Sequence, residues 1–168
     1  MGYFNRKIDN VLQQWSSEKP RKPLLLRGAR QVGKTTAVRH LSKSFKYFVE
    51  INFENKDHAA AKTIFEQHSD PKIICSELAA LFGKPILAGE TLLFLDEVQN
   101  CTEAIAALRY FYEQMPELHV IATGSLLEFA LEEIPSFGVG RIDSMFMYPF
   151  SFSEYLCAIC ERTRFSKS

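Results

Sequence analysis

The chain has 168 residues and a mass of 19.2 kDa, with 46% hydrophobic and 24% charged residues, which suits one domain with a hydrophobic core and excludes disorder and fibres. Twenty lysines and arginines balance twenty aspartates and glutamates, so no global field drives the chain onto nucleic acid or anionic lipid. No run approaches 18 apolar residues, and four unevenly spaced cysteines follow no signal peptide. We therefore expect no membrane contact and a cytoplasmic location with reduced thiols.

Helix and strand patterns alternate along the first half of the chain. Apolar residues at helical spacing predict a leading helix over residues 3–15. The short apolar run 24–26 and the helical pattern over 34–44 predict a strand, a loop with two glycines and a helix. Alternating β-branched and aromatic residues at 47–53 predict a second strand, and helical spacing returns at 57–67 and 71–82.

The second half continues the alternation. A strand buried on both faces is predicted at 92–95, a helix at 103–114, a fourth strand at 119–122, a helix around 125–133 and a fifth strand at 145–147. Ser151 and Glu154 have the spacing of a capping box, which predicts a final helix. Strands that alternate with helices of ten or more residues indicate an α/β fold with a doubly wound parallel sheet.

The loop after the first strand fits the phosphate-binding pattern G-x-x-x-x-G-K-[ST] in every specified position. Glycines let the backbone approach phosphate oxygens, and backbone N–H groups at a helix N-terminus bind the anion. Lys34 would reach the β- and γ-phosphates, and the Thr35 hydroxyl would bind Mg²⁺. The predicted nucleotide-binding residues are Gly28, Ala29, Arg30, Gln31, Val32, Gly33, Lys34, Thr35 and Thr36. The local basic segment 19–46, with nine lysines and arginines and no acid, is expected to serve the nucleotide rather than DNA.

Two carboxylates follow the apolar run at 92–95. Because a buried parallel strand delivers its carboxyl end to the ligand crevice, we expect Asp96 to meet the Mg²⁺ held by Thr35. Glu97 would then orient or deprotonate the attacking water. The guanine-reading Asn-Lys-x-Asp is absent, since residues 55–58 end in histidine, and Asp-x-x-Gly is absent at residues 96–99. These absences favour ATP over GTP.

Three further residues are candidates for contact with the γ-phosphate or its charge. Thr123 and Ser125 follow the fourth strand, where either could contact the γ-phosphate or the attacking water. Ser125 also has capping-box spacing with Glu128, so it could cap the next helix, contact the γ-phosphate, or do both. Arg141 lies on a loop with two glycines before the fifth strand and could stabilise transition-state charge in cis or from a neighbouring subunit. A surface arginine remains the alternative for Arg141.

In this order the motifs resemble the AAA+ superfamily ATPases of bacteria and archaea, in particular a family of predicted ATPases usually followed by a domain of unknown function. The matching stretches are residues 26–36, 95–99, 123–125, 140–141 and 149–154. The resemblance implies a P-loop NTPase of the AAA+ type, with three α/β/α layers and sheet order 5-1-4-3-2. It also implies Glu97 as catalytic base and Arg141 at the position of an arginine finger. Self-association that places Arg141 in trans is a possible consequence.

The resemblance also suggests how the chain is divided. We expect an N-terminal helix and lead-in over 1–20, the ATPase core over 21–150, and the start of a helical lid or C-terminal region over 151–168. Family members look more than twice as long, so DNA contact is expected only through a C-terminal domain that is missing here.

Two functions remain open at this stage. The first is an ATPase core that hydrolyses Mg²⁺-ATP to ADP and phosphate and drives a conformational change in an attached domain or partner. The second is a nucleotide-dependent switch with little or no turnover. A small-molecule kinase is disfavoured by the acid pair Asp96-Glu97.

Overall fold

The computed structural model describes residues 3–125, 127 and 140–165, and within them five parallel strands form one sheet in the order β2-β3-β4-β1-β5. This is the predicted order 5-1-4-3-2 taken from the other edge. The strands, in spatial order, are β2 Tyr47–Asn52, β3 Thr91–Asp96, β4 His119–Gly124, β1 Leu24–Arg27 and β5 Asp143–Phe146. All six residues of β3 and of β4 are buried, as expected for central strands with a helical layer on each face.

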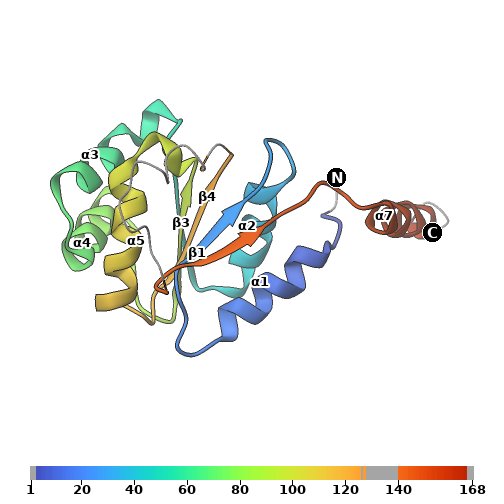
Figure 1. Ribbon diagram of the computed structural model, residues 1–168, viewed down its shortest axis with the longest axis horizontal. Helices are drawn as coiled ribbons and strands as arrows, with labels where there is room; N and C mark the ends of the chain where they lie inside the picture. Colours follow the sequence, from blue (N-terminus) through green and yellow to red (C-terminus); the bar gives the residue numbers. More distant parts are fainter. Residues whose placement is uncertain (1–2, 126, 128–139, 166–168) are drawn as a thin grey trace.

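Helices cover both faces of the sheet, so the predicted three-layer α/β/α fold is confirmed (Figure 1). One face carries α1 Lys7–Ser17 and α2 Lys34–Leu41; the other carries α3 Ala59–Gln67, α4 Pro71–Phe82 and α5 Thr102–Gln114. Each face has its own hydrophobic core. Leu12 and Trp15 of α1 are fully buried beside β1 and α2, so the leading helix belongs to the packed core.

The helix ends follow from local side chains. Asp70 accepts a hydrogen bond from the Lys72 N–H at the start of α4, Pro71 occupies the first turn, and Gly83 ends the helix in the left-handed region. The leading helix begins at Lys7 and not at residue 3, because Arg6 is extended and its N–H donates to the Asp9 carboxylate at 2.6 Å. Short 3₁₀ turns, at Ser42–Ser44, Lys56–His58 and Val98–Asn100, complete the connections.

The last described helix, α7 Phe152–Phe165, lies outside the two helical layers, near the N-terminus of the chain (Figure 1). Its predicted capping box is confirmed: the Glu154 N–H donates to Ser151 Oγ at 3.3 Å, and the Ser151 N–H donates to the Glu154 carboxylate at 2.8 Å. The apolar side chains of its first two turns, from Phe152 to Ile159, are exposed. The helix predicted around 125–133 falls mostly outside the described residues.

Across the described ranges, no helix combines the length and the apolar character that crossing a bilayer requires.

Candidate functional site

The phosphate loop connects the carboxyl end of β1 to the first turn of α2, as the motif predicts. Gly28 has φ +147°, and a Cβ at this position would lie 2.4 Å from the Met147 carbonyl oxygen, so only glycine fits. Gly33 has φ +98° and forms the N-cap of α2. The loop closes around its own lysine: Lys34 Nζ donates to the carbonyl oxygens of Gly28 at 2.7 Å and Ala29 at 2.8 Å.

Lys34 is 5% exposed. Burial lowers the pKa of its ammonium group below the ordinary value, and the negative charges of Glu97 and Asp96 offset part of that effect. The lysine is thus buried with carbonyl oxygens and two distant carboxylates as its electrostatic partners. A polyphosphate in the loop would supply the full counter-charge that this position lacks.

The Asp96 carboxylate joins the loop to the central strands. It accepts hydrogen bonds from Thr35 Oγ1 at 2.9 Å, from Asn52 Nδ2 at 3.3 Å, from the Glu97 N–H at 3.1 Å and from the Thr123 hydroxyl. Asp96 is 2% exposed, so these four donors replace the water that the charge has lost. The predicted pair of Thr35 and Asp96 is therefore assembled.

These two oxygen groups fit a magnesium ion. Mg²⁺ binds hard oxygen ligands and is usually held by one or two protein groups, with water and phosphate oxygens in its remaining positions. The described part of the chain has no cluster of three or more histidines, cysteines, aspartates or glutamates that could enclose a metal.

Glu97 follows β3 in an unusual conformation. Its φ of +53° places a non-glycine residue in the left-handed region, which costs about 1–2 kcal/mol and is typical of functional sites. Its Oε2 atom accepts hydrogen bonds from Gln99 Nε2 and, at 3.4 Å, from Ser125 Oγ. Ser125 therefore lies beside the proposed base, while its predicted capping partner Glu128 is outside the described residues.

Arg141 lies near the amino ends of the strands, at the end of the sheet opposite the phosphate loop. Because Asp143 at the start of β5 is in register with Leu24 at the start of β1, Arg141 is separated from the loop by at least one strand length, roughly 10 Å. Its Nε pairs with Glu113 on α5 at 2.8 Å. The structure thus places Arg141 beside Glu113 and not at the phosphate loop of its own chain, so of the two roles considered it does not favour the one in cis.

A cavity of about 480 Å³ lies beside the phosphate loop. Its lining combines aromatic and apolar side chains of the N-terminal segment and of the segment after β5 with residues of the phosphate loop. Its lining residues are Tyr3, Phe4, Arg6, Ala29, Arg30, Gln31, Val32, Gly33, Thr36, Pro149 and Phe150. A volume of this size exceeds that of a purine base, so the cavity has room for the base of a nucleotide whose phosphates bind the loop.

Three residues that contact the site do not stand out in the sequence. Asn52 could have been found as a polar residue at the carboxyl end of a strand predicted to neighbour that of Asp96, and Gln99 as a polar residue two positions after Glu97. Arg6, which donates to the Val32 carbonyl in the loop, has no local signal, because its partner is 26 residues away.

Solved structures with similar folds include proteins of greater length. The Walker-type ATPase PABY2304 of Pyrococcus abyssi is 22% identical, with a TM-score of 0.56, and the match covers 90% of this chain and 55% of that chain. DnaA from Aquifex aeolicus bound to AMPPCP is 16% identical, with a TM-score of 0.57, and the match covers 98% of this chain and 52% of that chain. Aeropyrum pernix Orc1 in complex with DNA is 14% identical, with a TM-score of 0.56, and the match covers 95% of this chain and 48% of that chain. The chain thus spans about half the length of each. At these identities the likeness shows the fold alone.

Sequence comparisons give a family but no close relative. No curated protein matches the chain. A family model described as an AAA domain matches residues 20–156, which include the phosphate loop, the acid pair and the strand-end residues described above. The chain therefore belongs to the AAA domain family of P-loop ATPases.

Proposed function

We propose that the chain binds Mg²⁺-ATP on residues 28–36 and hydrolyses it to ADP and phosphate, and that hydrolysis drives a conformational change in an attached domain or partner. The observation that carries the proposal is the hydrogen bond between Thr35 and Asp96, which joins two motifs 61 residues apart. In the sequence, Lys34 directly precedes Thr35 and Glu97 directly follows Asp96. Loop N–H groups and Lys34 would bind the phosphates. Thr35 and Asp96 would hold Mg²⁺, whose charge assists phosphoryl transfer.

Glu97 is the proposed general base. A carboxylate can orient the attacking water and accept its proton once both are in place. Because Arg141 pairs with Glu113 away from its own loop, we propose that any role for it in stabilising transition-state charge is played on a second copy of the chain.

One observation favours the second candidate, a nucleotide-dependent switch with little or no turnover. The Glu97 Oε2 atom already accepts hydrogen bonds from Gln99 and Ser125, so this oxygen is engaged with side chains of its own chain rather than with a water. The two functions therefore differ in whether Glu97 leaves these partners when ATP is bound.

The test is to measure ATP affinity and the steady-state hydrolysis rate with Mg²⁺ for the parent chain, Lys34→Ala and Glu97→Gln. Lys46→Ala and Glu90→Gln are matched controls, because this exposed ion pair carries the same two residue types away from the site. The ATPase proposal expects Lys34→Ala to lose binding, and Glu97→Gln to keep binding while its rate falls at least about a hundredfold. Binding without turnover in the parent favours the switch, and an absence of binding refutes both.

A further inference from the structure

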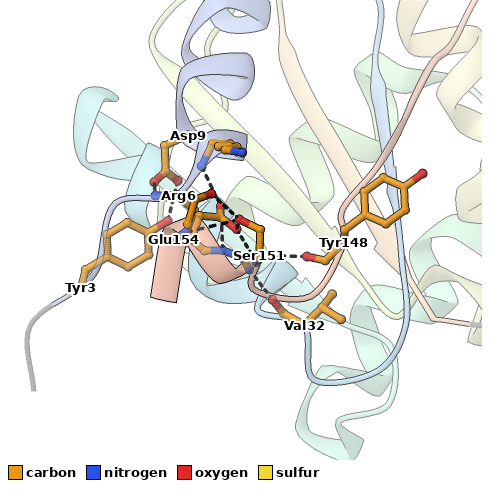
Figure 2. Close-up of polar contacts among 9 residues, drawn as sticks. Tyr3, Arg6, Asp9, Val32, Tyr148, Ser151 and Glu154 are labelled. Carbon is orange, nitrogen blue, oxygen red and sulfur yellow. Dashed lines mark hydrogen bonds and ion pairs between the residues drawn. The ribbon is translucent and has the colours of Figure 1, made fainter. Parts of the chain in front are cut away.

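Arg6 is a buried charge outside the recognised motifs. Its side chain is 6% exposed and it lies immediately before α1. Its guanidinium contacts three segments that are remote in sequence: the Val32 carbonyl of the phosphate loop at 2.6 Å, the Tyr148 carbonyl after β5 at 2.9 Å and the Glu154 carboxylate of α7 at 3.6 Å (Figure 2). The loop and the last helix are thus joined through one side chain.

The partners of Arg6 are themselves fixed. The Glu154 carboxylate accepts hydrogen bonds from the Lys7 N–H at 3.0 Å and from the N–H and hydroxyl of Ser151 at 2.8 and 2.9 Å. Burial raises the pKa of Glu154, but these hydrogen bonds and the Arg6 charge outweigh it and lower the pKa to about 2. The guanidinium also stacks on Phe150, with Cζ 4.2 Å from the ring centroid. A charge held from so many sides has one favourable position.

The contact with Val32 has a consequence for phosphate binding. In a trans peptide the C=O and the following N–H point in opposite directions, and the one cis peptide bond in the described residues precedes Pro20. Holding the Val32 carbonyl against Arg6 therefore turns the Gly33 N–H away from Arg6. A phosphate loop works only if its N–H groups face the anion and its carbonyl groups face elsewhere. With φ at +98°, Gly33 has backbone freedom that would otherwise let this peptide rotate.

We propose that Arg6 is a positioning residue that fixes the Val32–Gly33 peptide for phosphate binding and, through Glu154, couples the phosphate loop to α7. The nucleotide part of this inference rests on the proposed function, because it requires that ATP binds the loop. The coupling is reciprocal: whatever moves α7 changes the affinity of the loop for phosphate, and a bound phosphate stabilises α7 in its observed place.

The variant that tests this role is Arg6→Lys. Lysine keeps the charge opposite Glu154 but is a compact point charge, whereas the planar guanidinium donates to two carbonyl groups in fixed directions. Arg21→Lys is the matched control. Arg21 is equally buried, at 5% exposure, and donates to the carbonyl groups of Ser16, Glu18 and Glu117 at the opposite edge of the sheet.

The first measurement is ATP binding and turnover. Loss of one charge-assisted hydrogen bond predicts about a tenfold rise in the Kd for ATP in Arg6→Lys, and a rise in KM with little change in kcat, because the chemistry at Glu97 is untouched. Arg21→Lys should lower the unfolding temperature without changing the Kd. Equal effects of the two substitutions on the Kd, or none in Arg6→Lys, would overturn the positioning role.

The second measurement needs no nucleotide. Amide hydrogen exchange of the unliganded chain should quicken together in residues 28–35 and 152–159 in Arg6→Lys and in Glu154→Gln, and in neither segment in Arg21→Lys. Independent responses of the two segments refute the coupling. If the parent chain binds no ATP, the proposed function fails and the role in phosphate binding fails with it, while the exchange experiment still decides whether Arg6 couples the loop to α7.

Discussion

Replacing Asp96 with asparagine tests the centre of the site, because the structure shows which hydrogen bond must fail. Asp96 Oδ1 accepts from Thr123 and the Glu97 N–H, and Oδ2 accepts from Thr35 and Asn52. In Asp96→Asn an NH₂ group takes the place of one oxygen. The threonine hydroxyls can rotate and accept from it, but the Glu97 N–H and the Asn52 amide cannot. Asn52 is held in its present orientation because its Oδ1 accepts from the Glu54 N–H at 2.8 Å.

Either orientation of the new amide therefore leaves one buried donor facing another donor. A buried donor without an acceptor costs about 1–3 kcal/mol, and the remaining bonds lose their charge assistance. Relief from burying a carboxylate acts in the opposite direction, but four donors already replace its lost water, so this gain is small. We expect Asp96→Asn to lower the free energy of unfolding of the unliganded chain by about 2 kcal/mol, equivalent to roughly 6 °C in a chain of this size.

The assay is urea unfolding followed by fluorescence of Trp15, the only tryptophan in the chain, whose side chain is fully buried. Asp57→Asn, at an exposed aspartate, is the control and should change stability by less than about 0.5 kcal/mol. Asp96→Asn should also remove the dependence of ATP affinity on Mg²⁺. An Asp96→Asn chain that is as stable as the parent would refute the hydrogen-bond reasoning, and retained Mg²⁺ dependence would refute the assignment of Asp96 as a metal ligand.

Three other predictions follow from the same structure. Burial lowers the pKa of His119 to about 4, so the unfolded chain binds more protons than the folded chain between pH 6.5 and 4. The free energy of unfolding, measured in urea, should therefore fall by about 2 kcal/mol from pH 7.5 to pH 5. His119→Asn should remove this pH dependence. Gly28→Ala, whose Cβ would strike the Met147 carbonyl, should abolish ATP binding by calorimetry, whereas Gly89→Ala, with positive φ but open space, should leave binding unchanged. Arg141→Ala should leave the hydrolysis rate of dilute, monomeric chain unchanged and lower the rate per chain only at concentrations where the parent self-associates; a loss of rate in the monomer would contradict the proposed role of Arg141 in trans.

The features that sequence predicted well are those with local signals. The strands β3 and β4 follow from continuous apolar runs, and the glycine spacing and the lysine locate the phosphate loop without knowledge of any distant residue. The pairing of Thr35 with Asp96 needed one additional rule, that parallel strands present their carboxyl ends at a common edge.

The features that sequence missed depend on long-range geometry. Arg141 was a candidate because it lies on a loop with two glycines before the fifth strand, but a residue that precedes β5 falls at the amino ends of the strands, opposite the phosphate loop. The role of Arg6 depends on partners that are 26, 142 and 148 positions away, which no local pattern encodes. Asn52 is intermediate, since its strand was predicted but the reach of its side chain to Asp96 was not.

In the unliganded chain the key polar groups of the site are paired with one another rather than left open. Lys34 donates to two carbonyl groups of its own loop, and Asp96 accepts from the threonine that would share its metal ion. If ATP binds as proposed, it replaces these partners, and its affinity then reflects the difference between phosphate and carbonyl oxygens as acceptors for Lys34. Arg6 takes no part in this exchange, because its contact with the loop is to the Val32 carbonyl and not to Lys34 or Asp96. Under the proposed function, Lys34 and Asp96 would change partners when the nucleotide binds, whereas Arg6 would keep the loop in shape.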